Sequence, residues 1–323
     1  MENKNPLVSI VVITYNSSDF ILEALESCKN QTYKNIELII SDDCSTDNTV
    51  KKCREWLSNY TNRFERAIII ETKKNTGISA NLNRGVNATR ANWFKLTAGD
   101  DLLLNNCIED NVNFILSSKE DINIVSSIKI SFTVDSNGKK FFFSSGEKSV
   151  FFNKNITPED QYQLALRHIS PTPNTWFLKK KAFVDVGGCD ERFPMIEDIP
   201  LKLKLLIAGN KFYRLDTKTV LYRVHNKSVR IKSSDNLIYK DWFLNSLIPM
   251  KYTYVYPHIS RIEKLIFKYD CFIAMLFVKI NLNKRNKLNL ILNKLFILPS
   301  EMIYKYIRNR IRNHFSKKKA SEV

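Results

Sequence analysis

The stretch most able to do chemistry is NWFKLTAGDDLLL, residues 92–104, where two carboxylates stand side by side after an apolar run. Adjacent carboxylates repel each other, so Asp100 and Asp101 are tolerable at a strand end when a cation or a sugar hydroxyl lies between them. Hard oxygen ligands of this kind suit Mg²⁺ or Mn²⁺. The alternative is a solvated turn in which an aspartate caps a helix that begins at Leu102.

The elements around this stretch alternate between buried strands and amphipathic helices. The pattern predicts strands at 8–14, 36–41, 66–71 and 92–97, and helices at 19–29, 45–57 and 78–89. Strands that alternate with helices imply an α/β fold class with a parallel, doubly wound sheet. In such sheets ligands bind beyond the carboxyl ends of the strands, where successive loops converge.

Polar residues follow each of these four predicted strands. They form the segments Thr14-Tyr15-Asn16, Asp42-Asp43, Asn75-Thr76-Gly77 and Asp100-Asp101, which are therefore expected to line one edge of the sheet. The chain carries no GxGxxG and no GxxxxGK[ST] motif, so neither a dinucleotide fingerprint nor a P-loop explains that edge. What remains is a nucleotide held by side chains and a metal, with an aromatic ring and carboxylates around the base and ribose.

The run VSIVVITYNSSDFILEALESCKNQTYKNIELIISDDCSTDNT, followed by NTGISANLNRGVNATRANWFKLTAGDD, resembles the family 2 glycosyltransferases, which have a GT-A fold. The similarity extends over residues 7–230. It implies that Thr14 and Tyr15 flank the nucleotide base and that Asp43 hydrogen-bonds it. It also implies that Asp100 faces the ribose and Asp101 the metal, Mg²⁺ or Mn²⁺.

The same resemblance adds Asn16 and Asn83 to the nucleotide-sugar contacts. Many members carry an acid where this chain has Ala98, which leaves metal affinity and sugar contacts at that point open. Structural alternatives stay open as well. Tyr15 could cover the sheet edge, Asp43 could form an Asx-turn before a helix, and Asn83 could brace the segment 81–85.

The middle of the chain breaks the alternation of strands and helices. Residues 122–134 and 140–144 read as a β-hairpin in which Asn137-Gly138 favours a type I′ turn. In similar enzymes the half that begins here binds the acceptor. We therefore expect a GT-A domain at 1–233, with a donor half at about 1–120 and an acceptor half at about 121–233.

Two motifs of the acceptor half carry chemistry. In similar glycosyltransferases the Glu197-Asp198 pair supplies the catalytic base, Asp198, and Gly188 and Glu197 lie near the acceptor or sugar. The alternative is that Asp198 is the N-cap of the helix predicted at 201–208. His225, in the sequence YRVH, closes the site and binds the metal or diphosphate in similar enzymes, or it simply caps its strand.

Composition limits the remaining choices. Of 323 residues, 44% are hydrophobic, and the six cysteines show no CxxC spacing, which favours a folded protein in a reducing cytoplasm. The start of the chain does not read as a secretion signal, and no apolar run approaches the length of a membrane span. The net charge is +17, and residues 240–323 hold 17 basic against 5 acidic residues.

This basic region, residues 234–323, is predicted to be a helical extension with apolar stripes. The stripes are Leu288, Ile291, Leu292, Leu295 and Phe296, and then Ile303, Ile307, Ile311 and Phe315. Such helices either pack on the domain or lie on an anionic bilayer, and Lys317-Lys318-Lys319 favours the bilayer. We therefore expect a peripheral protein at the inner face of the cell membrane.

The resemblance implies an inverting glycosyltransferase that moves a sugar from a nucleotide-sugar, UDP-linked, to a saccharide or lipid-linked acceptor in bacterial surface-polysaccharide synthesis. A sugar nucleotidyltransferase is the first rival, but it needs a Gly-rich, Lys-containing loop after the first strand, and TYNSSD has neither residue. A basic nucleic-acid-binding or membrane-binding protein is the second. Nucleic acid is not expected as a partner, because the basic residues concentrate in terminal helices and do not interleave with aromatics across a groove.

Overall fold

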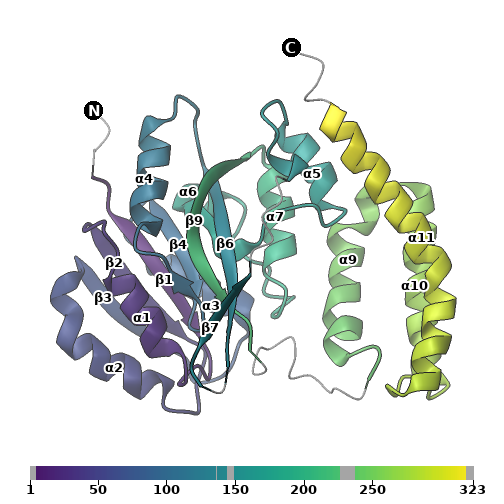
Figure 1. The fold of residues 1–323 in the computed structure, drawn as a ribbon, viewed down its shortest axis with the longest axis horizontal. Helices are drawn as coiled ribbons and strands as arrows, with labels where there is room; N and C mark the ends of the chain where they lie inside the picture. The colour runs from purple at the N-terminus through teal and green to yellow at the C-terminus, as the bar shows by residue number, and fades with distance from the viewer. Residues whose placement is uncertain (1–4, 136, 144–148, 226–236, 318–323) are drawn as a thin grey trace. The chain divides into compact units, whose positions relative to one another are not determined.

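The computed structural model describes residues 5–135, 137–143, 149–225 and 237–317. The chain divides into two compact units (Figure 1). The sheet unit comprises Met1–Lys148 and Pro171–His225, and the helical unit comprises Ser149–Ser170 and Asn226–Val323. The boundary expected near residue 233 lies outside the described residues. The segment Ser149–Ser170, which the sequence assigns to the acceptor half, is grouped with the C-terminal helices.

The first half of the sheet unit is the expected alternation of strands and helices. Its elements are β1 (Val8–Thr14), α1 (Ile21–Lys29), β2 (Ile36–Asp42), α2 (Thr49–Tyr60), η1 (Thr61–Arg63), β3 (Arg66–Glu71), α3 (Ile78–Asn87) and β4 (Trp93–Ala98). Strands β3, β2, β1 and β4 lie in that order and are parallel. Their β-branched and leucine side chains form the core, in which Val8, Ile10 and Val12 are fully buried.

The second half of the sheet unit is mixed. Its elements are β5 (Leu102–Leu103), α4 (Cys107–Ser117), β6 (Ile124–Val134), β7 (Lys140–Phe143), η3 (Pro173–Thr175), β8 (Trp176–Lys179), α6 (Lys180–Asp185), α7 (Asp198–Ile207) and β9 (Phe212–Arg223). The sheet continues from β4 through β8, β6 and β9 to β5, and β7 pairs with β6. The expected α/β fold with a mostly parallel sheet is thus confirmed.

The β6–β7 hairpin is present, but its turn differs from the expected one. The Gly138 N–H donates to the carbonyl of Asp135, and the Asp135 N–H donates to the carbonyl of Lys139. Gly138, at φ +79°, is therefore the last residue of a turn that begins at Asp135. In a type I′ turn it would be the third residue. The type I′ prediction is wrong because the Asp135 carboxylate also accepts from the Asn137 and Lys139 N–H groups and organises a longer loop.

The register of the parallel strands aligns their carboxyl ends. Thr14 at the end of β1 lies opposite Asp42 at the end of β2, and Asp42 lies opposite Glu71 at the end of β3. Ile13 lies opposite Ala98 at the end of β4. The loops that follow these strands therefore leave the sheet at one edge, as the sequence predicts.

The helical unit contains η2 (Val150–Phe152), α5 (Pro158–Ala165), a π-helix (Phe243–Leu247), α9 (Ile248–Tyr254), η5 (Tyr256–His258), α10 (Arg261–Lys279) and α11 (Lys287–Lys317). Arg167 and Glu263 form a buried ion pair with two N–H···O bonds of 2.9 Å, which joins the end of the α5 segment to the start of α10. None of the helices described here is apolar over a stretch long enough to cross a bilayer.

The second apolar stripe of the extension reaches the core of this unit at its C-terminal end. Phe315 is buried, its carbonyl accepts from Asn153 Nδ2 at 3.0 Å, and α11 packs on α5 and η2. Ile303, by contrast, is exposed. The reading of the 303–315 stripe as a membrane face is therefore wrong for Phe315, because the Ser149–Ser170 segment covers that end of the helix.

Candidate functional site

The two adjacent carboxylates after β4 occupy different environments. Leu102 does not begin a helix, because Leu102 and Leu103 form β5 and pair with β9. Asp101 is only 3% exposed, and its Oδ1 accepts a hydrogen bond from the Arg223 backbone N–H at 3.0 Å. Asn174 Nδ2 lies 3.5 Å from its other oxygen. Burial and the neighbouring Asp100 raise the pKa of Asp101 to about 7. This carboxylate ties the turn to the end of β9.

Asp100 is the more open of the pair. Its Oδ2 lies 3.0 Å from His225 Nε2, and its backbone carbonyl accepts from Arg223 Nε at 3.0 Å. The Phe20 ring packs 4.4 Å from the imidazole, measured between ring centroids. His225 and Asp100 are thus brought together by strands β9 and β4, although 125 residues separate them.

This pair fits part of a divalent-cation site. One carboxylate and one imidazole are acceptable ligands for Mg²⁺ or Mn²⁺, and such ions commonly take their remaining ligands from substrate phosphates and water. The described residues contain no group of three or more His, Cys, Asp or Glu side chains arranged for metal binding. Asp100 and His225 are thus the more open side chains at this point, with Asp101 buried behind them.

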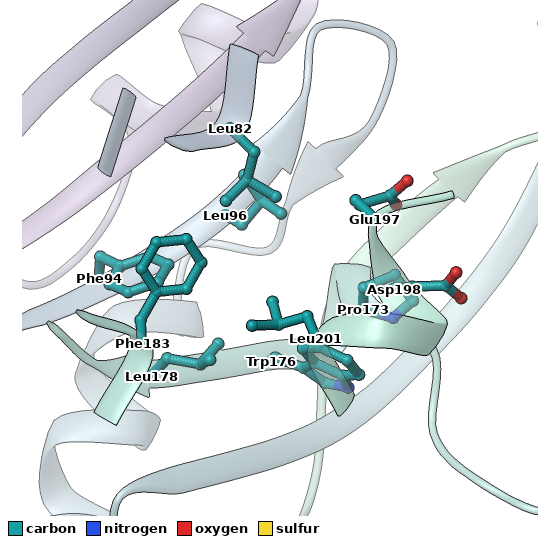
Figure 2. A pocket seen from close by; sticks show the side chains of 10 residues that line it. All are labelled: Leu82, Phe94, Leu96, Pro173, Trp176, Leu178, Phe183, Glu197, Asp198 and Leu201. Carbon is teal, nitrogen blue, oxygen red and sulfur yellow. The ribbon is translucent and has the colours of Figure 1, made fainter. Parts of the chain in front are cut away.

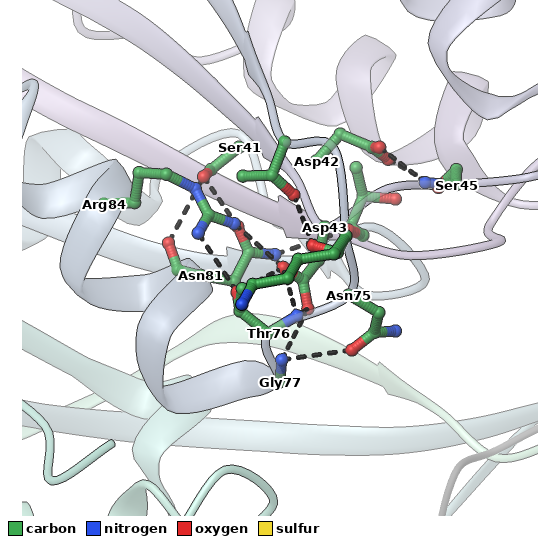
Figure 3. Close-up of polar contacts among 12 residues, drawn as sticks. Ser41, Asp42, Asp43, Ser45, Asn75, Thr76, Gly77, Asn81 and Arg84 are labelled. Atoms are coloured by element: carbon green, nitrogen blue, oxygen red, sulfur yellow. Dashed lines mark hydrogen bonds and ion pairs between the residues drawn. The ribbon is translucent and has the colours of Figure 1, made fainter.

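Asp43 is the centre of a hydrogen-bond cluster at the end of β2 (Figure 3). Its carboxylate accepts from the Thr76 hydroxyl at 2.6 Å, the Thr76 N–H at 3.0 Å, the Gly77 N–H at 2.7 Å and Arg84 Nη2 at 2.9 Å. The side chain is 2% exposed. Asp43 therefore holds the loop between β3 and α3.

The side-chain bonds to Ser45, at the turn before the next helix, are made by Asp42 and not by Asp43. Asp42 accepts from the Ser45 N–H at 2.7 Å and from the Ser45 hydroxyl at 2.5 Å. Burial raises the pKa of Asp42 in spite of these two bonds. Asn16, at φ +49°, accepts from the Thr46 N–H at 2.8 Å and donates its own N–H to the Ser45 hydroxyl. The loops after β1 and β2 are thus locked to each other.

Thr14 and Tyr15 stand at the exit of β1. Thr14 is buried, and within the described part of the chain its hydroxyl has no hydrogen-bond partner. A Cβ on Gly99 would lie 2.8 Å from that hydroxyl, so glycine is required there for β1 and the end of β4 to approach so closely. Tyr15 is 43% exposed. An exposed ring beside locked loops is suited to stacking on a flat ligand.

Asn83 and Gly188 contact each other instead of pointing into open space. The Asn83 amide accepts from the Cys189 N–H at 2.7 Å and donates to the Cys189 carbonyl and to Glu191. Gly188 has φ +59°, and a Cβ there would lie 2.6 Å from the Asn83 oxygen. The structure therefore favours the bracing role of Asn83, which clamps the 188–191 loop onto α3, over direct contact with a nucleotide-sugar.

Glu197 and Asp198 begin α7 beside a small apolar pocket (Figure 2). The pocket is lined by Leu82, Phe94, Leu96, Pro173, Trp176, Leu178, Phe183 and Leu201 in addition to the two acids. Figure 2 shows both carboxylates directed away from the apolar side chains. Asp198 is the first helical residue and Glu197 precedes it without a capping hydrogen bond, so the N-cap reading of Asp198 is wrong. That reading was the main structural alternative to a chemical role.

Two buried lysines near these carboxylates escaped the sequence reasoning. Lys95 is fully buried and donates to the carbonyls of Asn174 at 2.5 Å and Trp176 at 3.2 Å, which fixes η3 at the pocket wall. Lys202 lies four residues after Asp198, and burial lowers its pKa although Asp198 and Glu197 oppose that shift. The available signal was a lysine inside the apolar strand NWFKLTA and another inside the apolar helix after Pro200.

Comparison with known proteins agrees with this geometry. The family model described as glycosyl transferase family 2 matches residues 9–187. An uncharacterized glycosyltransferase of Haemophilus influenzae is 33% identical over 113 residues, which are 35% of this chain and 44% of that protein. The chain thus spans less than half the length of this relative. The Escherichia coli protein WfaP, a UDP-Glc:alpha-D-GlcNAc-diphosphoundecaprenol beta-1,3-glucosyltransferase, is 28% identical over 75% of this chain and 86% of its own.

Solved structures show the same fold. S. aureus TarS 1–349 in complex with UDP-GlcNAc superposes with a TM-score of 0.58 at 17% sequence identity, over 84% of this chain and 73% of that one. At this level of identity the similarity concerns the fold alone. It places the sheet of this chain among structures of the GT-A type.

Proposed function

We propose that this chain, which belongs to glycosyltransferase family 2, transfers a sugar from a UDP-sugar to an acceptor hydroxyl with inversion at the anomeric carbon. The observation that carries the proposal is the shared edge of β1, β2, β3 and β4, where four polar loops leave the sheet together. The carboxylate pair of α7 belongs to the same unit. Two sets of groups, one for a nucleotide and one for an acceptor, are what such a transfer needs.

On the donor side, Tyr15 is the side chain suited to stack on the base, and the loop held by Asp43 forms the opposite wall. Asp100 and His225 are the groups that would hold Mg²⁺ or Mn²⁺ against the diphosphate. When bound, such a cation would offset the negative charge that develops on the departing UDP. Asp101 contributes by holding the end of β9, and with it His225, at the end of β4.

On the acceptor side, Asp198 is proposed as the general base. Its carboxylate would accept the proton of the acceptor hydroxyl while the acceptor oxygen bonds to the anomeric carbon and the bond to UDP breaks. A single displacement of this kind inverts the configuration and requires no covalent enzyme intermediate. Lys202, one turn further along α7, interacts electrostatically with both acids.

We further propose a lipid-linked or surface-polysaccharide acceptor and a location at the cytoplasmic face of the membrane. The name of WfaP describes a diphosphoundecaprenol acceptor for that relative. In this chain, large apolar side chains at least 40% exposed follow one another along the two long helices of the helical unit. On α10 they are Ile262, Leu265, Phe272, Met275 and Val278, and on α11 they are Leu288, Leu290, Ile291, Leu295, Phe296, Leu298, Met302, Ile303 and Tyr306. Basic residues accompany them, as expected for an anionic surface.

The direct test is the release of UDP from UDP-glucose and UDP-GlcNAc, measured with and without a GlcNAc-diphospho-lipid acceptor. A glycosyltransferase should release UDP in an acceptor-dependent way, and NMR of the product should show an inverted anomeric centre. A nucleotidyltransferase would instead consume a nucleoside triphosphate and release pyrophosphate. Absence of UDP release across a panel of nucleotide-sugars and lipid-linked or saccharide acceptors would contradict the proposed reaction.

A further inference from the structure

The tip of the β6–β7 hairpin exposes three consecutive aromatic side chains. Phe141, Phe142 and Phe143 are 46%, 56% and 51% exposed, and together with Lys139 they are called here the aromatic tip. Among the described strands, β7 pairs only with β6. Exposed edge strands usually carry charges or prolines, because bare apolar edges promote association. Three adjacent phenylalanines at such an edge therefore indicate a surface that binds a partner.

The strand register shows that both faces of β7 carry this apolar surface. Phe142 lies opposite Phe132, with ring centroids 6.0 Å apart, so it covers a buried side chain while remaining half exposed. Phe141 lies opposite Thr133, and Phe143 lies opposite Ser131. The outer face thus sets two phenylalanines against two hydroxyl residues, and packing with the directly opposed residues of β6 does not explain them.

Two lysines lie beside these rings, and one of them pairs with an acid. The Lys139 ammonium lies 5.3 Å from the centroid of the Phe141 ring. Lys140 lies 5.5 Å from the Phe132 ring and also pairs with Glu23. The one acid of the turn, Asp135, accepts hydrogen bonds from backbone N–H groups of its own loop. Aromatic rings flanked by a lysine whose stem lies along them match the headgroup region of an anionic bilayer.

The hairpin is also continuous with the functional site. Phe132, beneath Phe142, receives the Arg223 guanidinium at 4.7 Å from its ring centroid. Arg223 is the last residue of β9, and His225 follows two residues later beside Asp100. Whatever surface the aromatic tip touches is therefore linked through one layer of side chains to the donor edge of the sheet.

We propose that the aromatic tip inserts into the headgroup region of an anionic bilayer and brings the site edge of the sheet unit to the membrane surface. The meaning of that placement rests on the proposed transfer to a lipid-linked acceptor, whereas insertion itself does not. The tip is separate from the exposed faces of α10 and α11 and belongs to the other unit.

This contact can be tested directly by hydrogen exchange of the full chain, measured with and without vesicles of phosphatidylcholine and phosphatidylglycerol. Peptides that cover residues 137–143 should exchange more slowly when the vesicles are present. The double variant Phe141→Thr/Phe143→Thr keeps β-propensity and leaves Phe142 over the core. It should lose this protection and bind vesicles about tenfold more weakly. Val184→Thr/Ile207→Thr is the matched control, because these apolar side chains of the sheet unit are 53% and 61% exposed.

Three outcomes would overturn the inference. Exchange at 137–143 could be the same with and without vesicles, or the control variant could lose as much vesicle affinity as the tip variant. Alternatively, the wild type could be a dimer in solution that the tip variant converts to a monomer, which would make the tip a contact between two copies. UDP release with a soluble acceptor should be unchanged in the tip variant. Failure of that assay in the wild type would contradict the proposed reaction and leave the membrane contact standing.

Discussion

Asp43→Asn is the change for which the structure allows the most explicit expectation. The carboxylate has one oxygen facing Gly77 N–H and the other facing Arg84 and the Thr76 hydroxyl, at 2.6 to 2.9 Å. An amide keeps one acceptor, and its NH₂ group must face a donor whichever way it turns. The least costly orientation keeps the Arg84 side and loses the bond from Gly77.

The expected loss of stability follows from these changes in hydrogen bonding. The variant loses a buried, charge-assisted hydrogen bond and sets one N–H group against another. We expect this to lower the free energy of unfolding by about 2–4 kcal/mol. For a unit of this size, that corresponds to a fall in Tm of roughly 5–15 °C. Thr76→Val is the graded control, because it removes the hydroxyl that donates to Asp43 and accepts from Arg84 Nη1, and leaves the backbone bonds in place. It should cost about 1 kcal/mol.

Two measurements on the purified variants decide the matter. Thermal unfolding gives the change in stability, and calorimetric titration with UDP at a temperature where both proteins are folded gives the affinity. Asp43→Asn should lose UDP affinity as well, because the 75–77 loop that it holds forms one wall of the expected base site. A Tm within a degree of wild type would refute the assignment of Asp43 as the residue that fixes this loop.

Three further predictions concern single residues. Asp198→Asn should retain UDP-sugar affinity but lose about 10²–10⁴-fold in turnover, and near-normal turnover would remove its role as base. Asp100→Ala should weaken Mn²⁺-dependent UDP binding by about 10–100-fold in calorimetry, whereas unchanged binding would return the metal role to Asp101. Glu263→Gln should destabilise the helical unit by about 3 kcal/mol at pH 7, because it leaves Arg167 without its buried partner. Burial alone would raise the pKa of Glu263, but bonds from Arg167 and Ser260 lower it below its ordinary 4.5, so wild type and variant should converge as pH falls through that lowered value.

The C-terminal helices also bear on how the membrane contact can be tested. Removal of everything after Asn283 would take away Leu292 and Ile297, which pack on the cluster of Tyr239, Ile273 and Phe277. It would also strip α11 from α5. A truncation would therefore unfold the helical unit, contrary to what the periodicity of the sequence alone suggests. Substitution of exposed side chains such as Leu265 and Met302 is the sounder design, since these are 68% and 64% exposed.

Local periodicity is sufficient to predict the strands of the first half of the sheet. The expected bounds of β1 and β3 agree with the structure, because β-branched runs closed by polar residues leave little choice of where a buried strand ends. The loops that follow these strands were also expected to meet. What periodicity could not decide was which of Asp42 and Asp43 bonds Ser45, since either carboxylate fits that pattern locally and only the position of the 75–77 loop separates them.

The second half depends on contacts that no local pattern contains. Asp101 bonds to the backbone of Arg223, 122 residues away, and Ser149–Ser170 joins helices that begin more than 70 residues later. Asn83 was read as a ligand contact because its neighbours resemble a motif, but its amide is engaged by Cys189 and Glu191. Its partners come from a loop whose path is set by Gly188, and glycine alone in a sequence does not reveal which neighbour requires it.

The contact between Asp100 and His225 follows from the register of β9 against β5. Leu221 lies opposite Leu102, and this pairing delivers the Arg223 N–H to Asp101 and, two residues later, the imidazole of His225 to Asp100. A shift of this register by one residue would turn His225 to the other face of the sheet and leave the Asp101 carboxylate buried without its backbone donor. The buried carboxylate and the open one therefore perform linked tasks. Asp101 holds the strand in register, and that register places the imidazole beside Asp100.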